Sequence, residues 1–125
     1  MKTPYKIAAA ILMLAATMAS AHDEAKGPNG GQVVDSKGHH LEFTAKDGAI
    51  SIYLTDEKDQ PIDSKGATGR VIIQDGATNT PVDLMPAEPN LLTAKIAAAL
   101  MPGAKLVVSA KLSDGHDIQG RFVAK

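Results

Sequence analysis

The strongest constraint on the fold is the alternation of apolar and polar residues in short runs that are separated by turn residues. The clearest run covers residues 41–54 and is interrupted by Asp47-Gly48. Asp-Gly is a preferred two-residue hairpin loop because it tolerates positive φ. With this loop Phe43 lies opposite Ile52, and the apolar side chains of both strands share one face. The pattern therefore predicts an antiparallel hairpin with one buried face.

A second alternating segment covers residues 106–122 and contains the turn Ser113-Asp114-Gly115. A two-residue loop would put the apolar faces of its two strands out of phase. A three-residue loop with Gly115 in the left-handed conformation places Ala110 opposite Ile118 and restores the common face. The sequence thus predicts a bulged hairpin here.

Further short strands are expected at residues 32–35, 71–74, 82–84 and 91–96. About eight short strands in one small domain are typical of a β-sandwich or small barrel. We predict an all-β fold over residues 32–125, a single antiparallel β-sandwich of immunoglobulin-like type with 7–8 strands. Residues 94–101 are rich in alanine and fit either a strand that runs into a loop or a helical turn. The expected core comprises Leu41, Phe43, Ile50, Ile52, Leu54, Val71, Ile73, Leu106, Val108 and Phe122.

The N-terminus has the pattern of a secretory signal peptide. Lys2 and Lys6 precede an apolar run from residue 7 to residue 19, and Ala19-Ser20-Ala21 is a small-x-small cleavage signal. A run of roughly 13 residues is too short to span a bilayer, which needs about 20. We predict a signal peptide over residues 1–21, a flexible polar arm over residues 22–31, and a periplasmic location without membrane insertion after cleavage.

The charge balance and the cysteine content exclude some classes of partner and metal site. Removal of residues 1–21 lowers the number of Lys and Arg residues from 13 to 11, against 14 Asp and Glu. This weakly acidic balance argues against a nucleic-acid partner. The chain has no cysteine, so disulfides and thiolate metal sites are excluded.

The sequence has none of the motifs of the common enzyme classes. It lacks a cysteine nucleophile, a Gly-x-Ser-x-Gly elbow, a phosphate loop, a dinucleotide fingerprint and a His-Glu-x-x-His pair. The acidic stretch 56–59 lacks the spacing of a calcium loop and is expected to form a solvated turn. We therefore expect a protein that is not an enzyme.

The candidate metal ligands are four histidines and one glutamate. Neutral imidazole is a common ligand of copper and zinc. His22 would start the mature chain and offer its amino and ring nitrogens as a copper chelate. His40 shares a strand face with Glu42, whereas His39 points to the opposite face. His116 follows the second hairpin turn. The alternative for each is an ordinary polar residue at a strand end, in a turn or in the arm.

Several segments resemble a family of short exported proteins and the N-terminal extension of periplasmic adaptor subunits of heavy-metal efflux pumps. The matching segments are 27–34 (Gly-Pro-Asn-Gly-Gly-Gln-Val-Val), 39–43 (His-His-Leu-Glu-Phe), 52–56 (Ile-Tyr-Leu-Thr-Asp), Pro61 and 65–67 (Lys-Gly-Ala). Asn29 stands where that family usually has histidine. The resemblance implies a periplasmic β-sandwich that handles copper or another divalent metal, with an efflux-system component as a partner.

Two functions are consistent with these observations. One is weak binding of copper, zinc or another divalent ion in periplasmic metal buffering or efflux, with His22, His39, His40, Glu42 and His116 as candidate ligands. The other is a metal-free interaction module that docks on an envelope protein.

Overall fold

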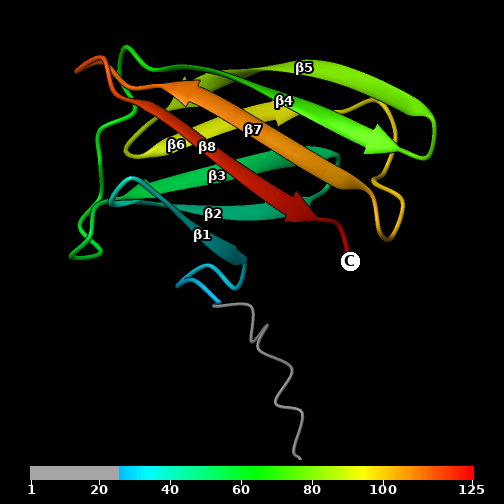
Figure 1. The fold of residues 1–125 in the computed structure, drawn as a ribbon, viewed down its shortest axis with the longest axis horizontal. Coiled ribbons are helices and arrows are strands. Elements are labelled where there is room, and N and C mark those ends of the chain that lie inside the picture. The colour runs from blue at the N-terminus through cyan, green and yellow to red at the C-terminus, as the bar shows by residue number, and fades with distance from the viewer. Residues whose placement is uncertain (1–25) are drawn as a thin grey trace, which may run out of the picture.

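The computed structural model describes residues 26–125 (Figure 1). The predicted signal peptide and His22 lie outside these residues. The strands are β1 (Gln32–Ser36), β2 (His39–Lys46), β3 (Ala49–Thr55), β4 (Thr68–Asp75), β5 (Thr78–Ala87), β6 (Leu91–Lys95), β7 (Lys105–Lys111) and β8 (Asp117–Val123). The described part of the chain contains no helix, which confirms the all-β prediction. Consequently, none of it forms an apolar helix long enough to cross a bilayer.

The eight strands form one antiparallel sheet in the order β1-β2-β3-β6-β5-β4-β7-β8. The long strand β5 joins the two halves, because residues 78–84 pair with β4 and residues 85–87 pair with β6. The sheet curves until β1 and β8 lie close together (Figure 1). The immunoglobulin-like sandwich prediction is therefore corrected to a single, nearly closed, barrel-like sheet.

Side chains of β1 bridge the seam to β8. The Gln32 side-chain amide accepts a hydrogen bond from the Val123 N–H at 3.2 Å and donates one to the Val123 carbonyl. At the other end of β1, the Ser36 hydroxyl oxygen accepts a hydrogen bond from the Gln119 N–H at 3.0 Å. These side chains bond to backbone groups of β8 that a neighbouring strand would otherwise pair with. Part of the hydrogen-bonding capacity at the outer edge of β8 is therefore used.

The first hairpin has the predicted register. Phe43 lies opposite Ile52, and the loop residues Asp47 and Gly48 have φ angles of 53° and 75°. Positive φ at both central residues gives a turn whose twist matches that of the flanking strands. The alternation and the turn chemistry thus identify the same pairing.

The second hairpin also has its predicted form. Ala110 lies opposite Ile118, and Gly115 has a φ of 92°. The Leu112 N–H donates to the His116 carbonyl at 2.9 Å, which closes a loop of three residues. The ambiguous segment 94–101 is the end of β6 followed by a loop rather than a helix.

The core lies between the two halves of the sheet. Phe43 and Phe122, from β2 and β8, have ring centroids 5.2 Å apart. Of the predicted core residues only Ile73 is partly exposed, and it still packs against the buried cluster. The other predicted residues are buried: Leu41, Phe43, Ile50, Ile52, Leu54, Val71, Leu106, Val108 and Phe122.

Candidate functional site

The fold brings two predicted ligands, His39 and His116, into contact. His39 is the first residue of β2, and His116 closes the loop before β8. Their ring centroids are 5.5 Å apart, and the ring planes are tilted by 50°. The two histidines are distant in the sequence, so their approach depends on the curvature that brings β8 near the β1–β2 end of the sheet.

The His39 ring contains a buried nitrogen without a protein partner. In the described part of the chain, His39 Nδ1 is the one buried side-chain nitrogen or oxygen atom that lacks a hydrogen bond. An unpaired buried polar atom destabilises the fold because its desolvation is not compensated. A group that bonds to this nitrogen would remove that penalty, and this unpaired atom distinguishes His39 from the other described histidines.

Asp114 orients the imidazole ring of His116, the second histidine of the pair. Its carboxylate lies 2.7 Å from His116 Nδ1 and accepts the His116 backbone N–H at 2.9 Å. Chiefly through that backbone hydrogen bond, and then through the ring contact, the loop lowers the pKa of Asp114 below its usual value of 3.8. An ionised carboxylate on one ring nitrogen directs the other, Nε2, toward a metal. Sequence patterns did not identify Asp114, although its position two residues before His116 in a tight turn was a usable signal.

His40 belongs to a separate polar cluster. Its Nδ1 lies 3.1 Å from an Asp59 carboxylate oxygen, and its Nε2 lies 3.5 Å from one of Asp35. Asp35 is its cross-strand neighbour on β1, whereas Asp59 belongs to the turn after β3. That turn is the solvated turn expected for residues 56–59. The Asp56 carboxylate accepts hydrogen bonds from two backbone N–H groups, those of Lys58 and Gln60. The bond from Gln60 contributes most to lowering the pKa of Asp56.

Glu42 is held inside a turn rather than beside His40. Its side chain is only 4 % exposed and accepts the N–H groups of Asn29 and Gly31 at 2.9 and 2.8 Å. The Asn29 side-chain amide donates a third hydrogen bond at 3.0 Å. A Cβ at Gly27 would lie 2.2 Å from the Glu42 carboxyl carbon, so the turn needs glycine there. The described part of the predicted arm thus folds onto a buried carboxylate.

The histidine pair is a two-donor arrangement. Within residues 26–125, no group of three or more His, Asp or Glu side chains is placed to hold a metal ion.

Comparison with known proteins identified no relative of the chain. No protein-family model, curated protein or solved structure gives a significant match.

Proposed function

We propose that this protein is an exported, non-enzymatic metal-binding protein that holds Cu(II) or Zn(II) weakly at His39 and His116. Its role would be metal buffering or delivery to an efflux system in the periplasm. The location rests on the signal-peptide pattern, and the efflux link rests on the family resemblance. The observation that carries the metal site is the juxtaposition of the two imidazoles, one of which has an unpaired buried nitrogen.

The spacing of the rings suits a shared ion. Two imidazoles on one tetrahedral zinc ion, with Zn–N bonds of about 2.0–2.1 Å, have ring centroids roughly 5 Å apart. The observed separation of 5.5 Å is close to this value. The Asp114–His116 contact adds the carboxylate–histidine support that is common in metal sites.

Two protein donors imply modest affinity. The remaining coordination positions would be filled by water or by groups that reach the site from outside the described residues. His22, with its amino group exposed by signal cleavage, is the predicted additional chelator. Recruitment of His22 would be opposed by about 1–2 kcal/mol for each residue of a flexible chain that it fixes.

The decisive experiment is a titration of the mature protein with Zn(II) and Cu(II), followed by the histidine ring signals in NMR. We expect zinc to shift, and copper to broaden, the His39 and His116 signals before those of His40. In His39→Ala the remaining His116 signal should no longer respond to metal. In His116→Ala the same should hold for the remaining His39 signal. His40→Ala is the matched control, because it removes a neighbouring imidazole that lies outside the pair.

Three outcomes separate the alternatives. Equal weakening by His40→Ala and His39→Ala would contradict the assigned pair. An extra residue placed before His22 should lower copper affinity if the N-terminal chelate takes part, and no change would exclude the chelate. Absence of binding at micromolar metal would overturn the metal function and leave the metal-free interaction module as the alternative.

A further inference from the structure

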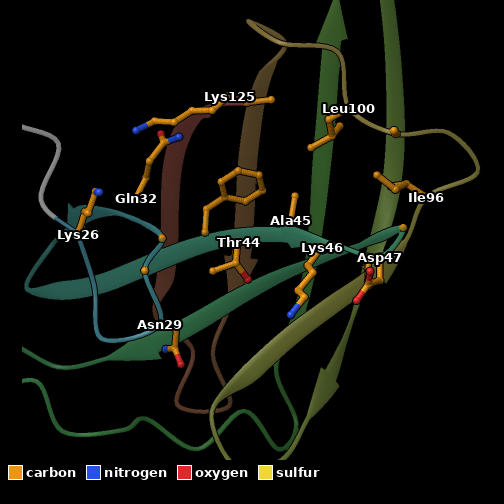
Figure 2. Close-up of a pocket in the computed structure, with 17 residues that line it drawn as sticks. Lys26, Asn29, Gln32, Thr44, Ala45, Lys46, Asp47, Ile96, Leu100 and Lys125 are labelled. Carbon is orange, nitrogen blue, oxygen red and sulfur yellow. The ribbon is translucent and has the colours of Figure 1, made fainter.

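A cavity of about 510 Å³ opens at the end of the sheet that contains the β2–β3 turn. Its walls are this turn, the loop after β6, the residues that precede β1 and the residues that follow β8 (Figure 2). Cavities of this size at the mouths of curved sheets commonly hold small organic molecules. Neither His39 nor His116 lines it, so it is independent of the proposed metal site.

The floor and one wall of the cavity are apolar. Ala45 lies on the inward face of β2 together with Leu41 and Phe43, yet it is exposed because the cavity opens above it. Phe43 forms the floor, and the half-buried Ile96 and Leu100 form one side. A ligand with a hydrocarbon body would therefore cover apolar surface that is continuous with the core.

The opposite side of the cavity is polar and positively charged. Figure 2 shows Lys26, Gln32 and Lys125 at one end of the lining, with Ile96 and Leu100 at the other. In total the lining includes three lysines, at 26, 46 and 125, and one carboxylate side chain, Asp47. Figure 2 shows Lys46 pointing to the side of β2 opposite to Ala45, so the lysines at the Gln32 end of the cavity are Lys26 and Lys125. The charges thus favour an anionic group at the end where Lys26 lies.

We propose that this cavity binds a small organic anion with an apolar body, of the class of medium-chain aliphatic carboxylates. The carboxylate lies beside Lys26, because the Gln32 side chain is already bonded to the Val123 backbone. The hydrocarbon extends over Phe43 toward Ile96 and Leu100. A chain of about eight carbons suits a cavity in the lower half of the usual range of ligand-site volumes, about 300–1,000 Å³.

The test uses octanoate as the probe and follows the backbone amide signals of the mature protein by NMR. We expect saturable shifts in the β2–β3 turn and in residues 96–100, at millimolar or lower octanoate. Ala45→Phe should abolish binding, because the ring occupies the mouth of the cavity. Lys26→Ala should weaken binding about two- to five-fold, as expected for a solvent-exposed ion pair.

Two controls make the result specific. Lys65→Ala changes the net charge equally but lies outside the cavity, so it should leave octanoate affinity unchanged. Octanamide has the same hydrocarbon without the charge and should bind more weakly than octanoate. The proposal is overturned if octanoate causes no saturable shifts, if Ala45→Phe binds it as well as the native chain, or if octanamide binds equally tightly.

Discussion

At the scale of single residues, Glu42 has a structural role that its strand position did not predict. Its buried carboxylate is the acceptor that organises the turn before β1. The alternation of β2 placed it on the polar face, where it was expected to be a metal ligand beside His40. Its oxygens are instead occupied by the Asn29 and Gly31 donors, so its candidacy as a ligand requires that this turn open.

We predict that Glu42→Ala destabilises the domain by about 1–3 kcal/mol, because it leaves the buried Gly31 N–H and the part-buried Asn29 N–H without an acceptor. Glu42→Gln should cost less, since its side-chain carbonyl can still accept a hydrogen bond. Denaturant unfolding measures both losses, and amide exchange at Asn29 and Gly31 should accelerate in both variants. Unchanged exchange at these two amides would show that the carboxylate does not hold the turn.

Phe43 provides the matching test of the apolar core. Its side chain is 6 % exposed and contacts Phe122. We expect Phe43→Ala to lower the free energy of unfolding by about 3–5 kcal/mol through lost burial and a residual cavity. Without disulfides, such a loss is a large part of the stability of a domain this small. A loss below about 1 kcal/mol in denaturant unfolding would be inconsistent with an enclosed ring.

At the scale of elements, the β7–β8 hairpin loop both reverses the chain and supports His116. Gly115 has a φ of 92°, and a Cβ added to it would meet open space, so a side chain there causes backbone strain and not a clash. We predict that Gly115→Ala costs about 1–2 kcal/mol in unfolding free energy. Gly115→Asn should cost less, because asparagine adopts the left-handed conformation more readily. Equal losses would argue against strain as the cause.

The same loop should respond to acid through Asp114. Its pKa is lowered mainly by the His116 backbone hydrogen bond, so the contribution of this carboxylate to stability is present above pH 3.8. That contribution is lost as the pH falls through the lowered pKa. The advantage of the native chain over Asp114→Ala should therefore disappear on acidification. NMR titration should place the Asp114 midpoint below 3.8, and a midpoint above it would contradict the loop geometry.

At the scale of the whole molecule, the important feature is the seam between β1 and β8. Gln32 and Ser36 bridge it with side chains, and a Cβ at Gly120 would lie only 2.7 Å from a Val34 methyl group. The missing side chain of Gly120 thus allows β1 to approach β8 closely. This approach turns a curved sheet into a nearly closed one.

We predict that Gln32→Ala loosens the seam, because it removes both hydrogen bonds to the Val123 backbone. Amide exchange at Val123 should become faster, while exchange at residues in the β4–β5 pairing should change little. Gln74→Ala, which removes the same type of side chain from β4, is the control and should leave Val123 unaffected. Similar protection of Val123 in both variants would mean that the seam does not depend on this side chain.

The sequence by itself determined the all-β class, the registers of both hairpins and most of the core. These features are local, because period-two alternation and the conformational preferences of Asp47, Gly48 and Gly115 act between residues that are near neighbours in the chain. The tertiary structure alone decided that β5 joins both halves of the sheet and that β1 reaches β8. It also decided that His39 meets His116 while Glu42 is enclosed by a glycine-rich turn. Such contacts depend on how far the whole sheet curves, and the alternation along any single strand is the same in an open sandwich and in a closed sheet.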